Sequence, residues 1–157
     1  MVALSALGLM SCGDEGLLPT TVSRGSDFVQ EDVVFDDQFF YCRVEPVLFA
    51  QSCGAGVAGM DTTSGCHFSV TKFRLTNYAP LVAEGGCIGD ALTATAMPPV
   101  AAQQNYTAAQ ARMKRDPNLA ALLQRPTGKA QHPRKIFELN SPEADVIRAW
   151  ATQFSSQ

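Results

Sequence analysis

Apolar residues recur at helical spacing in separate stretches of the chain, and no stretch alternates apolar and polar residues over the length of a long strand. The first helical stretch follows Asp36 and Asp37, either of which can cap a helix. Because Pro46 interrupts the pattern, we expect it to kink this helix or to divide it into two short pieces. The apolar positions of the stretch are Phe39, Phe40, Val44, Val47 and Leu48.

Two further helices are indicated by a capping residue followed by proline at the first helical position. Asp116-Pro117 opens "NLAALLQR", which Pro126 ends, and Ser141-Pro142-Glu143 opens the last helix of the chain. We expect Trp150 and Phe154 to pack against the first helix, near Phe39 or Phe40. The apolar stripe of the last helix consists of Val146, Ile147, Trp150 and Phe154.

The segments between these helices are predicted to be mostly loops. Residues 54–65 contain four glycines, and residues 91–104 contain Pro98 and Pro99, which exclude a helix interior. A short helix is expected over Leu75–Leu81, ended by the glycines at 85 and 86. The pattern therefore predicts an all-α class with long loops.

The N-terminus has a composition of its own. Residues 1–12 are apolar and carry no charge, and they are too short to span a bilayer. Their end, Leu9-Met10-Ser11-Cys12, resembles the lipobox of bacterial lipoprotein signal peptides, which implies an exported protein whose Cys12 carries a lipid that anchors it to a membrane. Residues 13–34 are predicted to form a flexible tether, and the domain is expected over residues 35–157.

A chain of 157 residues is long enough for one domain with a hydrophobic core. Its net charge of −3 gives no indication of nucleic-acid binding. The charges are segregated, with seven acids and one base over residues 14–37, and seven bases and one acid over residues 112–135. The basic stretch is either a solvated surface or a patch that orients an anionic group.

Export also changes how the other four cysteines are interpreted, because thiols outside the cytoplasm are oxidised or covalently occupied. Four cysteines allow two disulfides, or two thioether bonds to a haem and one disulfide. Cys66-His67 has the adjacency of a haem c attachment site, but the nearest upstream cysteine is Cys53, which leaves a spacer of twelve residues instead of two. The longer loop costs roughly 1.5 kcal/mol more to close, whereas a Cys53–Cys66 disulfide would contribute about 3 kcal/mol. Both interpretations are physically permissible.

The surrounding sequence resembles bacterial mono-haem cytochrome c domains of the type abundant in planctomycetes and myxobacteria. The resemblance covers roughly residues 40–151, with Pro133 and Arg134 where that type has glycines. It is carried by "YCRVEPVLFAQSCG", "FRLTNYAPLV", "DPNLAALLQRPTGKAQHPRKIF" and "SPEADVIRAWA", in that order along the chain. It implies a small helical cytochrome c-like domain with long loops around one covalent haem c. Cys53 and Cys66 would then carry the thioethers, and His67 would be the proximal iron ligand.

The resemblance leaves the second axial ligand open. His132 stands where the family has a downstream histidine, Met97 lies in a Met-Pro-Pro step, and Met113 is a third option; we rank His132 first. With two cysteines attached to haem, Cys42 and Cys87 are expected to form a disulfide. Basic residues near the haem would orient its propionates or an anionic partner.

The implied function is one-electron transfer between redox partner proteins in the periplasm or cell envelope, and not enzymatic catalysis. No paired carboxylates, Ser-His-Asp set or phosphate-binding loop is found in the sequence. The alternative is a secreted lipoprotein without haem, in which two disulfides support a binding or adhesion module. A zinc site made of Cys53, Cys66, His67 and His132 is a third interpretation, although its spacing is unlike that of common zinc modules.

Overall fold

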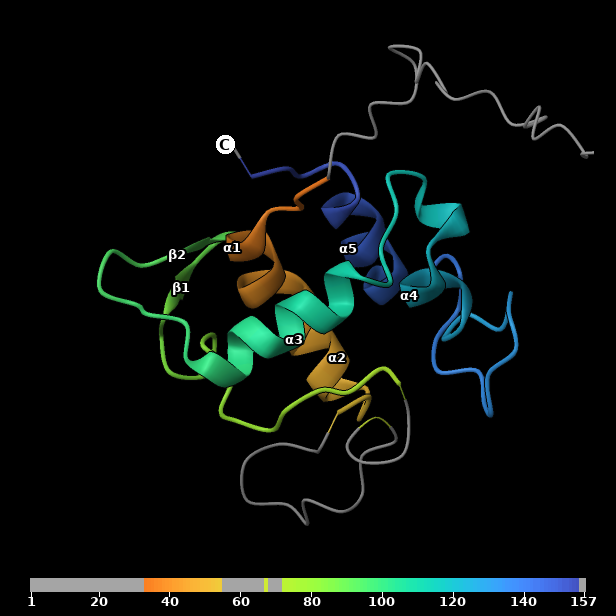
Figure 1. The fold of residues 1–157 in the computed structure, drawn as a ribbon, viewed down its shortest axis with the longest axis horizontal. Helices are drawn as coiled ribbons and strands as arrows, with labels where there is room; N and C mark the ends of the chain where they lie inside the picture. Colours follow the sequence, from red (N-terminus) through yellow and green to blue (C-terminus); the bar gives the residue numbers. More distant parts are fainter. Residues whose placement is uncertain (1–32, 55–66, 68–71, 156–157) are drawn as a thin grey trace, which may run out of the picture. The chain divides into compact units, whose positions relative to one another are not determined.

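Figure 1 shows the computed structural model, in which helices of unequal length are joined by long loops and a short two-stranded hairpin lies at one edge. The structure describes residues 33–54, 67 and 72–155, which belong to one unit, residues 32–157. Four helices are found in this described part when the first is counted as one continuous element. None of them is long and apolar enough to cross a bilayer.

The first helix is continuous, so the expected division at Pro46 is wrong. It consists of α1 (Asp37–Phe39), a π-helical turn (Phe40–Val44) and α2 (Glu45–Ala50). Asp36 caps it as expected, because its Oδ1 accepts a hydrogen bond from the Phe39 N–H at 2.7 Å. The Glu45 N–H donates to the Phe40 carbonyl five residues back. Where a helix returns from hydrogen bonds five residues back to bonds four residues back, one carbonyl is left without a helical N–H partner. Pro46, which has no N–H to donate, is accommodated at this position.

The hairpin was not expected from the sequence. Its strands, β1 (Cys87–Ile88) and β2 (Ala91–Leu92), pair antiparallel, with Cys87 opposite Leu92. Strands of two residues are too short to leave an alternating pattern in the sequence. Cys87 forms a disulfide with Cys42 of the first helix, with an S–S distance of 2.11 Å. This is the pairing that the resemblance implied, and it fastens the hairpin to the middle of the first helix.

The short helix expected over Leu75–Leu81 is wrong. Residues 74–80 form no regular element, and a turn over residues 81–85 ends at Gly85, whose φ is +71°. Two hydrogen bonds with the Asn105 side chain, which accepts one from the Thr76 N–H and donates one to the Thr76 carbonyl, hold the backbone of Thr76 at a separation of 29 residues along the chain. A side chain from another element therefore takes the backbone groups that a local helix would have used.

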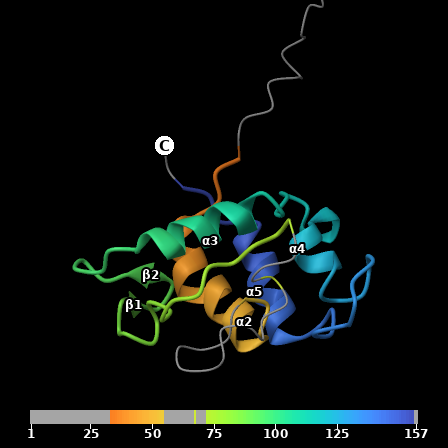
Figure 2. The ribbon, with the colours of Figure 1, turned by 60° about the horizontal axis from the view of Figure 1, so that its bottom comes forward.

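Helix α3 (Val100–Gln110) begins directly after Pro99. The two prolines do exclude a helix interior at their own positions, but they also precede a helix start, which the sequence pattern did not indicate. The helix has no apolar stripe of its own, because its residues are mainly alanine and glutamine. Figure 2 shows the first helix passing between α3 and α5 (Pro142–Trp150).

The predicted start signals of the last two helical segments are confirmed. The Asp116 side chain accepts a hydrogen bond from the Asn118 N–H at 2.9 Å, and the Ser141 Oγ accepts one from the Ala144 N–H at 3.4 Å. The first of these segments is divided into a 3₁₀ turn (Pro117–Leu119) and α4 (Ala121–Gln124), which ends before Pro126. The second forms α5 without interruption.

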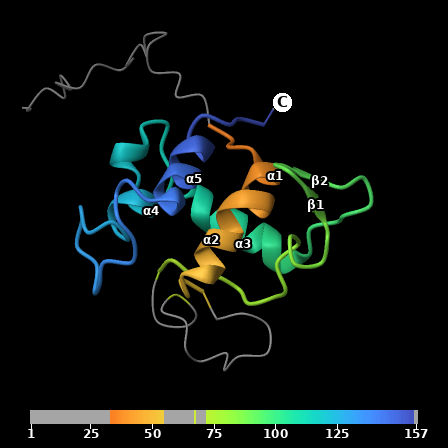
Figure 3. The ribbon, with the colours of Figure 1, turned by 180° about the vertical axis from the view of Figure 1, so that it is seen from behind.

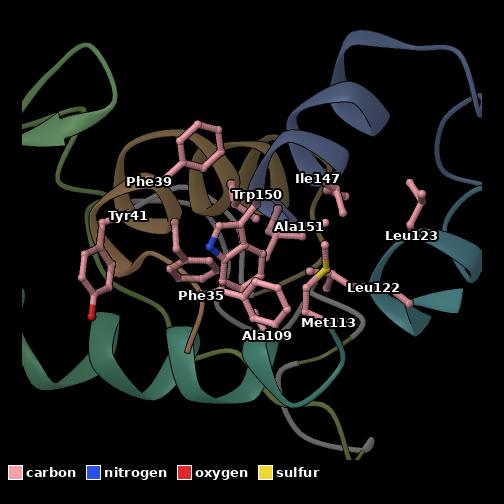
Figure 4. Close-up of a cluster of buried hydrophobic side chains, with 14 of the residues drawn as sticks. Phe35, Phe39, Tyr41, Ala109, Met113, Leu122, Leu123, Ile147, Trp150 and Ala151 are labelled. Carbon is pink, nitrogen blue, oxygen red and sulfur yellow. The ribbon is translucent and has the colours of Figure 1, made fainter. Parts of the chain in front are cut away.

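Trp150 is the centre of the hydrophobic core (Figure 4). Its ring centroid lies 5.1 Å from that of Phe40 and 5.4 Å from that of Phe35, and its Nε1–H donates to the Asp36 carbonyl at 2.7 Å. The predicted contact between the last helix and Phe40 is therefore confirmed for Trp150. Phe154 instead packs on Phe35, at 5.8 Å between ring centroids, and remains 47% exposed.

Candidate haem-binding site

The end of α2 and the residue His67 are joined through their backbones. The Cys53 N–H donates to the Leu48 carbonyl at 2.9 Å, so that Cys53 directly follows the last turn of the helix. The His67 N–H donates to the Cys53 carbonyl, and the His67 carbonyl accepts from the Leu75 N–H, both at 3.0 Å. The structure thus brings together two of the three residues expected to form the attachment motif, although twelve residues and Cys66 separate them in the sequence.

A glycine follows Cys53 for a steric reason. A Cβ at Gly54 would lie 3.2 Å from the Cβ of Leu75, which is tighter than ordinary van der Waals contact, and it would also touch the Phe49 ring at 3.4 Å. Cys53 itself is half-buried and packs against the core. The small residue therefore allows Leu75 to lie close to the end of α2. Figure 3 shows, from behind, the chain that leads on from residue 72 running past the end of α2.

Two of the predicted cysteines, together with most of the spacer, fall outside the part of the chain that is described. Cys66 lies in the range 55–66, and Cys12 lies in the range 1–32. The second thioether and the lipidation site therefore remain predictions.

The structure places His132 beside His67. Their ring centroids are 6.0 Å apart, with 34° between the ring planes. Two imidazoles that bind one metal ion from opposite sides, each with a nitrogen at about 2 Å, have centroids roughly 6 Å apart. The spacing of the two rings therefore fits axial ligation of one iron.

The hydrogen bond of His132 identifies the nitrogen that remains for a metal. Its Nδ1 lies 2.6 Å from the Arg134 carbonyl oxygen, which can only accept. Nδ1 must then carry the proton, so the lone pair of the neutral ring is on Nε2. Metal-binding histidines are commonly oriented by such a carbonyl on their other nitrogen.

The surroundings of His67 favour its neutral form, which is the form that binds metals. Burial lowers the pKa of His67, and the nearby His132 and Arg125 lower it further, while a hydrogen bond to the Phe73 backbone acts in the opposite direction. The Phe73 ring stands edge-on to the imidazole at 4.9 Å between centroids. Neither Phe73 nor Arg125 was individually predicted to have a role at this site. The sequence signals that include them are the segment "FRLTNYAPLV", which resembles cytochromes and contains Phe73, and the basic stretch over residues 112–135, which contains Arg125.

The two methionine candidates have very different surroundings. Met97 is 85% exposed, at the surface shortly before α3. Met113 is 7% exposed and lies in the core cluster shown in Figure 4, near Trp150. Of the three candidates for the second axial ligand, His132 is the one for which the structure gives a contact with His67.

Among the described residues, no group of three or more His, Cys, Asp or Glu side chains is arranged to hold a metal ion. A haem does not require such a group, because its porphyrin supplies four of the iron ligands and the cysteines bind the porphyrin edge. The residue types and the spacing of the two imidazoles are therefore compatible with a c-type haem.

Comparison with known proteins yields no matching family model, no matching curated protein and no matching solved structure.

Proposed function

We propose that this chain is an exported, lipid-anchored protein whose single domain carries electrons one at a time through a covalently bound haem c. The observation that carries the proposal is the pair of imidazoles, His67 and His132, with centroids 6.0 Å apart. The backbone hydrogen bond between His67 and Cys53 adds support, because it holds a cysteine next to the proximal ligand despite the long spacer.

In this proposal His67 and His132 would hold the haem iron, and Cys53 and Cys66 would carry the thioethers. A haem bound there supplies the Fe(III)/Fe(II) couple, and two histidines favour a lower potential than histidine with methionine. The protein orients the imidazoles through the carbonyls of Phe73 and Arg134 and limits water access to His67 by burial. Arg125 adds positive charge close to the site, where it can pair with a propionate or an acidic partner.

A visible spectrum of the full chain tests this proposal. The chain is exported in a host with cytochrome c maturation machinery, alongside a control cytochrome, and spectra are recorded before and after dithionite reduction. We expect a sharp reduced α band whose chromophore stays with the protein during acid-acetone extraction. A colourless, folded, thiol-free chain from a host that matures the control would overturn the proposal and leave the alternative with two disulfides.

Matched variants test the ligand assignment. His67→Ala is expected to abolish stable iron binding, and His132→Ala is expected to keep the covalent haem but to convert a low-spin ferric spectrum to high-spin. Met97→Leu is the control and is expected to leave the spectrum unchanged, because Met97 is 85% exposed. A high-spin spectrum in Met97→Leu with an unchanged spectrum in His132→Ala would assign Met97 instead.

A further inference from the structure

A carboxylate is buried in the middle of the fold, away from the proposed iron ligands. Glu45, in α2, is 1% exposed, and the structure gives it no cationic partner among the described residues. Its Oε1 accepts a hydrogen bond from the Asn105 Nδ2 at 2.8 Å, and its Oε2 accepts one from the Tyr78 hydroxyl. Two donors from different segments therefore converge on one side chain, and a carboxylate brings the two acceptor oxygens that they need.

Asn105 is fully buried and connects this carboxylate to the segment after His67. Its Oδ1 accepts a hydrogen bond from the Thr76 N–H at 2.5 Å, and its Nδ2 donates to the Thr76 carbonyl at 2.9 Å. The side-chain amide thus pairs with both the N–H and the C=O of one residue, as a residue of a neighbouring antiparallel strand would. Both N–H groups of the amide are used, one on Glu45 and one on Thr76.

These contacts belong to a ring of hydrogen bonds, here called the circuit, that leaves the first helix at Glu45, passes the candidate haem site and returns to the same helix at Leu48. Next to Thr76, Leu75 donates its N–H to the His67 carbonyl, and His67 donates its N–H to the Cys53 carbonyl. Cys53 then donates to the carbonyl of Leu48, which lies about one helical turn beyond Glu45 in α2. The circuit begins and ends on the same helix and contains both Cys53 and His67.

We propose that Glu45, Asn105 and Tyr78, here called the polar clamp, are positioning residues that hold the backbone of His67 and Cys53 in the geometry needed to attach a haem. The inference rests on the proposed function. Burying a carboxylate is costly, and apolar residues of similar size would fill the same space at lower cost. A fully satisfied polar network instead selects one arrangement of the segments that it joins. Here those segments are α2, α3 and the extended stretch that aligns His67.

Amide hydrogen exchange of the full chain tests the clamp, and it can be measured whether or not haem is bound. Asn105→Leu removes the bonds to Glu45 and Thr76 at similar volume. We expect exchange of the His67 and Leu75 amides to become at least about tenfold faster, while the Ala151 amide, bonded within α5, changes less than about twofold.

The control is Thr127→Val, which also removes a buried side-chain hydrogen bond, from the Thr127 Oγ1 to the Leu123 carbonyl at 2.7 Å. This variant is expected to leave the His67 and Leu75 amides unchanged. If Asn105→Leu does not fold, Tyr78→Phe is used instead, because it removes only one hydroxyl. We expect exchange of the His67 and Leu75 amides to become faster in this variant too, but by a smaller factor.

The outcomes separate the clamp from the haem. Equal acceleration of all amides, or no acceleration at His67 and Leu75, would overturn the clamp even in a red, haem-loaded protein. Selective acceleration in a colourless protein would uphold the positioning of His67 and Cys53 while the haem function itself failed. When the Asn105→Leu chain carries haem, we expect both faster exchange confined to the His67 and Leu75 amides and a larger high-spin ferric fraction.

Discussion

The substitution Glu45→Gln is expected to change how stability depends on pH. Burial raises the pKa of Glu45 from 4.5 to about 7, and the hydrogen bonds from Tyr78 and Asn105 oppose that rise without cancelling it. Below pH 4.5 the carboxyl group is neutral in both the folded and the unfolded chain, so its contribution to stability is fully present. Between pH 4.5 and 7 it ionises freely only in the unfolded chain, and the contribution is lost.

The size of the effect follows from the shift in pKa. A change from 4.5 to about 7 corresponds to a loss of up to about 3 kcal/mol in the free energy of unfolding. The glutamine side chain of the variant cannot ionise, so this loss is absent there. The free energy of unfolding of the native chain, relative to the variant, should therefore fall across this window and stay constant above about pH 8.

Urea denaturation of both proteins at intervals from pH 4 to 8.5, with the disulfide intact and the same haem content, measures this difference. Taking the difference between the two proteins removes the titration of the other acids, which both share. A difference that stays constant within about 0.5 kcal/mol, or that rises with pH, would refute the reasoning. The second result would mean that the hydrogen bonds from Tyr78 and Asn105 dominate and lower the pKa of Glu45.

Three further variants are expected to change the free energy of unfolding, measured by urea denaturation at pH 7, in a definite order. Replacing both Cys42 and Cys87 by Ser removes a cross-link spanning 45 residues, and should cost about 4 kcal/mol; a loss below about 1 kcal/mol would contradict this. Trp150→Phe leaves a cavity and removes the Nε1 hydrogen bond, and should cost about 2 kcal/mol; an unchanged midpoint would show that the core refills the space. Asp90→Asn breaks an ion pair with Arg43 between side chains that are 62% and 48% exposed, and should change stability by less than about 0.5 kcal/mol; a larger loss would indicate a role for this pair beyond the surface contact.

The sequence by itself determined the features that depend on residues three or four positions apart. Ser141 was predicted as a cap, and Asp36 was one of two candidate caps with Asp37; Asp36 and Ser141 each accept a capping backbone hydrogen bond. Trp150 was predicted to pack against the first helix because it lies on the apolar stripe of α5. Such signals can be read locally, because the donor and the acceptor belong to the same turn of chain.

The candidate site was only partly predictable. Its residue types, two cysteines and two histidines, were recognised from the sequence, which left His132, Met97 and Met113 as candidates for a second ligand, with His132 ranked first. The structure adds their surroundings: the ring of His132 lies 6.0 Å from that of His67 between centroids, whereas Met97 is exposed at the surface and Met113 is buried in the core.

Tertiary structure alone decided the path of the chain around that site. Residues 74–80 carry apolar positions compatible with a helix, yet they are extended, because Asn105 from α3 takes the peptide hydrogen bonds of Thr76. The buried Glu45 gave no sign of burial in the sequence either, since an acid near a helix proline is usually solvated. In both cases the partners are tens of residues away, so the outcome depends on which packed arrangement satisfies every buried polar group at once. Local sequence patterns do not indicate which distant residues will satisfy a buried polar group.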